Sequence, residues 1–445
     1  MKNRHFQALL LALTFTCPTL FADGSTSSNR EADLAIARDE FVLKSLSFSD
    51  DNRQKALKFL DDLQPQLNRL SNEAYLLAML KTAAFAGNGH DMLITGKGWH
   101  PSQQLPLRLL WLRDGVLVTR AAPAHADLLG AVVESIDGHE PETIARDLQN
   151  YRGGPLAMVR WDITWLIEQA GMLHAMGLAK APDRLQFRLR KADGSLIERS
   201  VLFVPKSAIP DGMRPHRQYS MQPNASEQQK GWQTMRVPTA EPWYLQQAEL
   251  PYRLSTDDQL NALLLQLRLH FDTDGHSLSE FIEQAIAAIE KNSARHLIVD
   301  LRFDLGGNVD LTQPLRPVIA KHPFERIVVL TGPHTLSAGI IMAAELKQLG
   351  RERVTIIGDE VGDTLRFWSE GQQVCLPHSQ YCFIRSTGVW DLQHGCAGEP
   401  ACYGDRFDVR VESLKPDIYA PLTVAALRSG RDPAMEAAAE LLNSR

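Results

Sequence analysis

The sequence predicts an α/β protein in which a helical N-terminal region and a β-rich module precede a domain built on a parallel sheet. Helical periodicity fills residues 31–86, short alternating strands follow over 105–205, and strands and helices alternate over 280–358. Strand–helix–strand alternation at this spacing is typical of a parallel sheet with right-handed crossovers. The chain has 445 residues, enough for about two or three domains.

The N-terminal region is predicted to be a helical cap domain over residues 30–98. Apolar residues recur there at three- and four-residue steps. Ser71 is placed as the N-cap of the last helix, which has Glu73 in its first turn and ends at Gly87.

A β-rich module is predicted over residues 103–205, where short apolar runs are broken by Gly and Asp. Asp193-Gly194 supplies a tight reversal between two of its strands. Residues 206–240 are rich in Pro, Gln, Ser and Asn and are expected to be a linker or long loop. The α/β domain then occupies residues 241–445.

Three nearly continuous apolar runs in this last domain indicate buried parallel strands, namely "RHLIVDLR", "ERIVVLTG" and "RVTIIGD". The segment "SEFIEQAIAAIEKN" is the helix before the first run, and "SAGIIMAAELKQLG" is the helix between the second and the third. Ligand sites in such sheets lie beyond the carboxyl ends of the strands. We therefore expect the chemistry of this protein in the loops that follow those runs.

Composition and charge limit the function classes. The formal net charge is −6 at pH 7, and this mild acidity argues against nucleic acid as the main partner. After the first 22 residues no apolar run approaches the ~20 residues that span a bilayer, so we expect no integral membrane segment in the mature chain.

Residues 1–22 have the pattern of a secretory signal peptide. Lys2 and Arg4 precede an apolar run that ends at the small residue Ala22. The alternative is an N-terminal helix that stays on the chain, which Pro18 would break near its end. We expect an exported protein, periplasmic or secreted, that is cleaved after Ala22.

Four cysteines lie close together near the C-terminus: Cys375, Cys382, Cys396 and Cys402. Their spacing does not match a zinc site, and no His spacing accompanies them. In an exported chain two local disulfides are expected, and we favour Cys375–Cys382 and Cys396–Cys402. The alternative is buried free thiols.

Two loops at predicted strand ends carry candidate chemistry. In "DLRFDLGGN", Gly306 and Gly307 can present bare N–H groups to a developing oxyanion. In "LTGPHTLSAGI", Ser337 stands where a strand gives way to a helix. It can be an N-cap only, or a nucleophile whose charge the helix N-terminus stabilises. A Gly-Gly pair by itself is more often only a turn.

A serine nucleophile needs a base. His90, in "FAGNGHDML", follows the last helix of the cap domain, and His334 lies close to Ser337 in sequence. Imidazole is the side chain best matched to proton transfer near neutral pH. The alternative for His90 is an ordinary surface histidine.

Over roughly residues 60–440 these motifs together resemble the serine peptidases of the C-terminal processing protease and tricorn core family. The similar segments, in order, are "NGHDMLI", the stretch from "LPLRLLWL" to "IDGHEPETI", "HLIVDLRFDLGGN", "VVLTGPHTLSAG", "VTIIGDEVGD" and "LKPDIYAPLT" with "GRDPAMEAA". The resemblance implies a crotonase-like α/β catalytic domain and a PDZ-like module over 103–205. It also implies that Ser337 is the nucleophile and that Gly307 or Gly306, with the N–H of Ala338, forms the oxyanion hole.

The chain departs from the family pattern at several positions. Processing proteases place a Lys base about 25 residues after the serine, where this chain has Gly362, and the nearby arginines cannot serve because Arg does not deprotonate. The tricorn branch uses a His before the PDZ-like module, which supports His90, although Gly89 replaces the usual Ser. Asp304 replaces the usual Asn, and a carboxylate beside an oxyanion site opposes its charge unless it is turned away or neutralised.

An acid that orients His90 is not evident in the sequence, and Glu360 and Glu412 are the candidates. These observations predict an exported serine peptidase that cleaves extended peptides and captures them as an added strand on the PDZ-like module. A catalytically inactive peptide-binding protein on the same fold is the alternative, and an esterase would differ only in substrate. The sequence has no H-E-x-x-H, P-loop or Rossmann fingerprint, so no cofactor or metal is expected.

Overall fold

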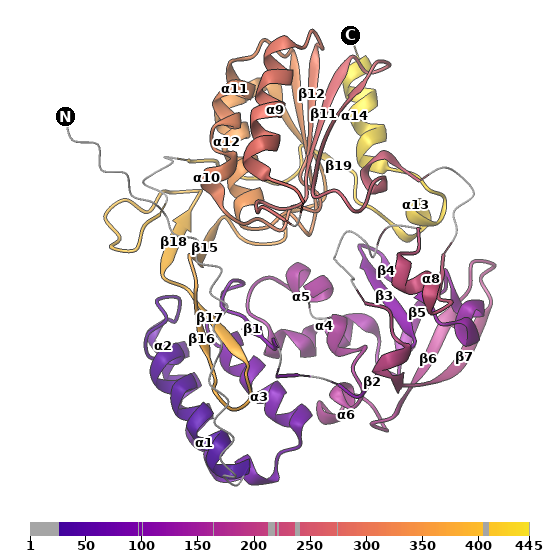
Figure 1. Cartoon of the computed structure of the whole chain (residues 1–445), viewed down its shortest axis with the longest axis vertical. Helices are drawn as coiled ribbons and strands as arrows, with labels where there is room; N and C mark the ends of the chain where they lie inside the picture. Colours follow the sequence, from indigo (N-terminus) through magenta and orange to yellow (C-terminus); the bar gives the residue numbers. More distant parts are fainter. Residues whose placement is uncertain are drawn as a thin grey trace.

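The computed structural model describes residues 26–444, apart from Lys97, His100, Ile163, Asp274 and the ranges 212–218, 220–221, 236–240 and 404–408. The predicted signal peptide lies outside the described residues. Figure 1 shows the α/β domain at the top, the helical region at the lower left and the β-rich module at the lower right. No helix in the described part of the chain is long and apolar enough to cross a membrane.

The α/β domain is built on a six-stranded sheet whose strands from β11 to β19 pair in parallel. The predicted runs form its centre, as β12, β13 and β14, and an antiparallel strand, β10, closes one edge. In sheet order the strands are β10 (Tyr252–Asp257), β11 (Ala262–Leu267), β12 (His296–Asp300), β13 (Arg326–Thr331), β14 (Val354–Gly358) and β19 (Ile418–Tyr419).

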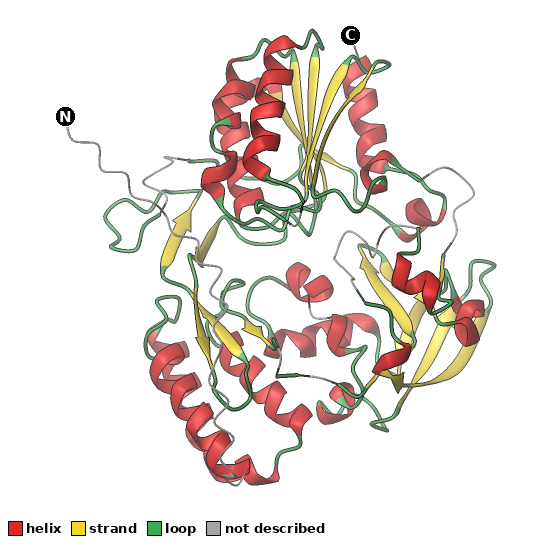
Figure 2. Cartoon of the chain, in the orientation of Figure 1, coloured by secondary structure: helices red, strands yellow, loops and turns green. Residues whose placement is uncertain are grey.

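Helices cover both faces of this sheet (Figure 2). Because strand side chains alternate, Leu297 and Val299 of β12 face one helical layer, whereas Ile298 faces the other. The first layer contains α9 (Leu278–Lys291), α10 (Val309–Thr312), α11 (Leu315–Lys321) and α12 (Ala338–Gly350), and the second is α14 (Pro433–Asn443). Short helices η7 (Trp243–Leu245), η8 (Arg351–Arg353) and α13 (Val424–Arg428) complete the domain.

The N-terminal region is helical, as predicted. Its elements are α1 (Thr26–Ile36), the π-helix η1 (Ala37–Val42), α2 (Asp50–Leu63), the 3₁₀ helix η2 (Gln64–Arg69) and α3 (Asn72–Ala84). Ser71 caps α3, because its hydroxyl accepts a hydrogen bond of 3.1 Å from the N–H of Ala74.

A small sheet joins this helical region to a segment almost 300 residues later in the chain. It has the order β1 (Leu93–Ile94), β17 (Cys382–Arg385) and β16 (Gln372–Cys375). The ring of Phe41 stacks on Phe383 at 4.4 Å between centroids, and both side chains are fully buried. The pair β15 (Arg366–Ser369) and β18 (Gly388–Asp391) connects this sheet to the α/β domain (Figure 1).

The β-rich module is an antiparallel sheet of the order β3 (Leu107–Leu112), β4 (Gly115–Ala121), β5 (Val132–Ile136), β6 (Arg184–Arg190) and β7 (Leu196–Leu202). The predicted turn lies between β6 and β7, with Gly194 at φ 85°. Further elements are β2 (Gln103–Gln104), η3 (Pro123–Leu128), α4 (Pro141–Leu148), η4 (Gln149–Tyr151), α5 (Leu156–Asp162), η5 (Thr164–Leu166), α6 (Met172–Ala175), β8 (Val204–Pro205) and η6 (Lys206–Ala208).

Part of the segment expected to be a linker, 206–240, is ordered against this module. It includes α8 (Ala225–Gln229) and β9 (Gln233–Thr234), and β9 pairs with β4. Arg120 of β4 and Glu227 of α8 form an ion pair of 2.7 Å, and each is 1% exposed.

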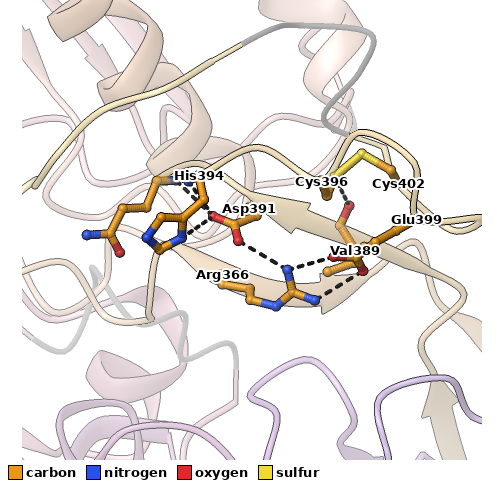
Figure 3. Close-up of a disulfide and its surroundings, with 8 residues drawn as sticks. Arg366, Val389, Asp391, His394, Cys396, Glu399 and Cys402 are labelled. Carbon is orange, nitrogen blue, oxygen red and sulfur yellow. Dashed lines mark hydrogen bonds and ion pairs between the residues drawn. A yellow bond between two sulfur atoms is a disulfide. The ribbon is translucent and has the colours of Figure 1, made fainter.

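The four clustered cysteines pair as the sequence predicts. Cys375–Cys382 joins opposite residues of β16 and β17. Cys396–Cys402 closes a loop that follows β18, and Figure 3 shows this loop beside Arg366. The Arg366 guanidinium bonds Glu399, inside the loop, and Asp391 of β18.

We predict that mass mapping without reduction finds both of these pairs. Replacing Cys396 and Cys402 together by Ser should lower the free energy of unfolding by about 2–3 kcal/mol at most, because each bridge closes only a short loop. Chemical denaturation would measure the change. Four free thiols in the purified protein would contradict the assignment.

Candidate active site

Ser337 lies at the carboxyl edge of the parallel sheet, where the loop after β13 enters α12. Its backbone has φ 49° and ψ −119°, a left-handed conformation that a residue with a side chain rarely adopts. Such strain persists only where the surrounding structure enforces it, and it clusters at functional sites. Ser337 also sits at the positive end of the α12 dipole, which favours negative charge beside it.

The Gly306–Gly307 loop approaches Ser337 so closely that only glycine fits. A Cβ atom on Gly306 would lie 2.6 Å from the Cβ of Ser337, and one on Gly307 would lie 2.6 Å from the carbonyl oxygen of His270. Gly306 and Gly307 have φ values of 81° and 138°. A side chain on Gly306 would therefore collide with the Ser337 loop, and a side chain on Gly307 would collide with the backbone of His270.

The backbone N–H groups near Ser337 are not equally available. The N–H of Gly306 donates to the Oδ1 of Asp304 at 2.9 Å. A parallel bridge to His270 uses the Gly306 carbonyl and the Asn308 N–H, so it does not use the N–H of Gly307. Ala338 is the first residue of α12, where N–H groups have no intrahelical acceptor.

Asp304 does not present a free carboxylate to this site. Its Oδ2 lies 2.7 Å from His270 Nε2, and both side chains are 0% exposed. Its backbone carbonyl accepts a hydrogen bond of 2.9 Å from the N–H of Leu336, immediately before Ser337. Asp304 therefore bonds both loops of the site, while its charge is directed at His270.

His90 packs against residues from the segment after β14. Its Nδ1 lies 3.5 Å from the Oδ2 of Asp363, and the side chains are 18% and 2% exposed. Neither atom has a hydrogen-bond partner among the described residues. The imidazole also stacks on Phe367, with centroids 5.0 Å apart. A small movement of either side chain would make a direct hydrogen bond.

The residues on both sides of His90 are held by a buried polar network. The Asn88 side chain bonds the backbone of Trp368 twice, accepting from its N–H and donating to its carbonyl, both at 3.0 Å. Asp91 accepts hydrogen bonds of 2.8 Å from the hydroxyls of Ser45 and Ser386. His90 is thereby fixed to strand β15 and its neighbours, far away in the sequence.

Gly362 stands where the processing proteases are expected to have their Lys. Its N–H donates to the carbonyl of Thr335 at 3.0 Å, and a Cβ atom there would lie 2.0 Å from the carbonyl oxygen of Pro333. No side chain fits at this position without a shift of the backbone. A Ser–Lys dyad is therefore excluded at Gly362 by space as well as by residue type.

His334, the second candidate base, is buried at 3% exposure. Its Nε2 lies 2.8 Å from the hydroxyl of Tyr219, and burial lowers the pKa of His334 to about 3. An imidazole with so low a pKa is too weak a base to take a proton from serine near neutral pH.

The acid beside His90 is Asp363, which sequence reasoning missed. Glu360 lines a different cavity, at the carboxyl ends of the sheet strands. Glu412 is exposed, and its carbonyl accepts a hydrogen bond of 3.2 Å from Gln393. Asp363 directly follows Gly362, but Asp359 and Glu360 lie in the same segment, so the sequence alone does not single out Asp363.

No known protein-family model matches the chain, and no curated protein matches its sequence. Among solved structures, mature CPAF complexed with lactacystin aligns with a TM-score of 0.58 and 13% identity, over 94% of this chain and 98% of that one. A CPAF mutant with serine replaced by alanine aligns with a TM-score of 0.57 and 14% identity, over 94% and 97%.

The photosystem II D1 C-terminal processing protease aligns with 13% identity over 93% of this chain and 99% of that one, but with a TM-score of 0.37, which supports no conclusion. At such identities similarity shows the fold alone. This chain therefore has the fold of mature CPAF over almost its whole length.

We predict that Gly362→Ala lowers the free energy of unfolding by about 2 kcal/mol or more. The new methyl group would overlap a backbone carbonyl, which can move only if the main chain shifts. Gly332→Ala is a matched control, since a Cβ there makes only ordinary contacts, the nearest at 3.7 Å, and neither glycine has a positive φ. Denaturant unfolding would compare the two. Equal, small losses would contradict the close packing at Gly362.

Proposed function

We propose that this protein is an exported serine peptidase in which Ser337 is the nucleophile and His90 the general base. The observation that carries the proposal is the strained Ser337 at a helix N-terminus, pressed against a Gly-Gly loop that only glycine can form. This geometry supports an activated serine beside an oxyanion hole better than it supports a simple N-cap, since the Ser337 side chain makes no capping hydrogen bond.

In the proposed mechanism the Ser337 hydroxyl attacks a peptide carbonyl while His90 takes its proton. The N–H groups of Gly307 and Ala338 receive the oxyanion of the tetrahedral intermediate. Asp363 orients the imidazole and stabilises its protonated form. His90 then gives the proton to the leaving amine, and water hydrolyses the acyl-enzyme by the same steps.

Peptide substrates are supported by two features. The fold is that of mature CPAF, whose solved forms include a serine-to-alanine mutant and a complex with lactacystin. The β-rich module, which we take to be PDZ-like, has strand β7 at the edge of its sheet, and an edge strand can pair with an extended peptide.

The predicted signal peptide and the two disulfides support export to the periplasm or beyond.

An inactive peptide-binding protein is the second candidate. The 3.5 Å separation of His90 and Asp363 favours it, because the pair does not form a close hydrogen bond in this state. One labelling experiment distinguishes the two functions, because only an activated serine reacts with a fluorophosphonate.

We predict that a fluorophosphonate probe labels the wild-type protein at Ser337. Ser337→Ala should abolish labelling, and His90→Ala should slow it by several orders of magnitude, because nucleophile and base act as a unit. Asp363→Asn should slow it less, since the imidazole remains present. Intact-mass analysis measures the labelling, and an unlabelled, folded wild-type protein would favour the inactive alternative.

We also predict that Asp304 and His270 set the rate by positioning the Gly306–Gly307 loop. Asp304→Asn should keep most activity, because an amide oxygen still accepts from the Gly306 N–H. His270→Leu should lower kcat about 100-fold, comparable to the loss of one oxyanion donor, with little change in KM.

If His270 had a purely structural role, His270→Leu would lower the unfolding temperature but would not lower kcat selectively while leaving KM unchanged. His296→Leu is the matched control, because His296 is also buried, at 4% exposure, but lies at the start of β12. Equal kinetic losses in the two Leu variants would contradict the positioning role.

A further inference from the structure

A cavity of about 90 Å³ lies between the carboxyl ends of β12, β13 and β14 and the β-rich module. In Figure 1 this is the region where the lower end of the α/β domain faces β3 and α5. Six ring side chains contribute to its wall, and we call it the aromatic cavity: Trp111, Trp161, Tyr219, Tyr244, Phe303 and His334. Neither Ser337 nor His90 lines it.

The rings of the aromatic cavity support one another. Phe303 packs on Tyr219 with centroids 4.8 Å apart and on Tyr244 at 5.8 Å, while Trp161 contacts His334 at 4.6 Å. Phe303, Tyr244 and His334 are each at most 5% exposed. The wall therefore joins the α/β domain to the β-rich module through packed rings.

Several of the charges around the cavity are compensated by neighbours. Arg302 bonds Asp300 at 2.8 Å and Asp432 at 2.7 Å, and Arg160 bonds Glu142 at 2.6 Å. The imidazole of His334 is occupied at Nε2 by Tyr219 and is kept neutral by burial, which lowers its pKa to about 3. The wall also includes Arg113, Asp359 and Glu360, while its ring side chains suit an apolar occupant.

The loop of Gly306 and the loop of Ser337 each contribute a side chain to the cavity wall. Phe303 lines the cavity three residues before Gly306, and His334 lines it three residues before Ser337. Three residues of chain span at most about 10–11 Å, so a peptide bound at Ser337 would have side chains within reach of this cavity.

We propose that the aromatic cavity is the specificity pocket of this enzyme and that it takes a large apolar, preferably aromatic, side chain of the substrate close to the cleaved bond. The inference rests on the proposed peptidase function and adds the substrate class to it. A volume of 90 Å³, at ~10–15 Å³ for each water-sized group, holds about six to nine such groups, which matches an aromatic side chain.

The test uses the full-length mature protein and a set of peptides that differ at one position, with Phe, Leu, Ala or Asp beside the cleaved bond. We expect kcat/KM for the Phe peptide to exceed that for the Ala peptide by about 10-fold to 200-fold, the range that apolar pocket contacts provide.

The variant Ala157→Leu fills the cavity from α5 and should reduce this ratio of kcat/KM values about tenfold. Ala425→Leu, the same change at an exposed helix position outside the cavity, should leave it unchanged.

A second variant keeps the test informative if Ala157→Leu does not fold. Trp161→Ala enlarges the cavity and should shift preference from Phe towards Trp at the same position. Equal cleavage of the Phe and Ala peptides by the wild type, or an unaltered ratio in both folded variants, would overturn the pocket while fluorophosphonate labelling of Ser337 still upholds the peptidase. A wild type that is not labelled would overturn both.

Discussion

Asp304 makes the contact on which the rest of the candidate site depends. Its carboxylate fixes the Gly306 peptide and meets His270, and its carbonyl holds the N–H of Leu336, so one buried residue sets the separation of the two loops. A buried carboxylate is costly unless its oxygens are satisfied. Here both oxygens have partners, so the carboxylate is satisfied within the core.

A second constraint comes from chain segments that are distant in sequence. His90 has no local structure to hold it, because it lies between α3 and the two-residue strand β1. Its position is set by Asn88, which bonds the backbone of Trp368, and by the ring of Phe367. The β15–β18 connection therefore carries the C-terminal half of the chain back to the N-terminal helices and brings Asp363 and Phe367 beside His90.

The fold could be predicted where local pattern determines structure. Continuous apolar runs identified β12, β13 and β14, and the hydroxyl of Ser71 was recognisable as a cap from its place before the helix. Contacts that join distant segments left no such signal. The packing of Asp363 against His90 and the burial of Glu227 beside Arg120 depend on which surfaces meet, and spacing along the chain does not encode that.

The loss of the expected Lys and the presence of Asp363 have one physical explanation. The segment after β14 packs its backbone against the loop of Ser337, since Gly362 donates to Thr335 and leaves no space for a side chain. A base cannot come from that residue. The next side chain, Asp363, lies beside His90, with its Oδ2 3.5 Å from the imidazole Nδ1. The position that excludes a Lys is thus followed directly by the acid that lies beside His90, and this is the basis on which we propose the Ser, His and Asp arrangement.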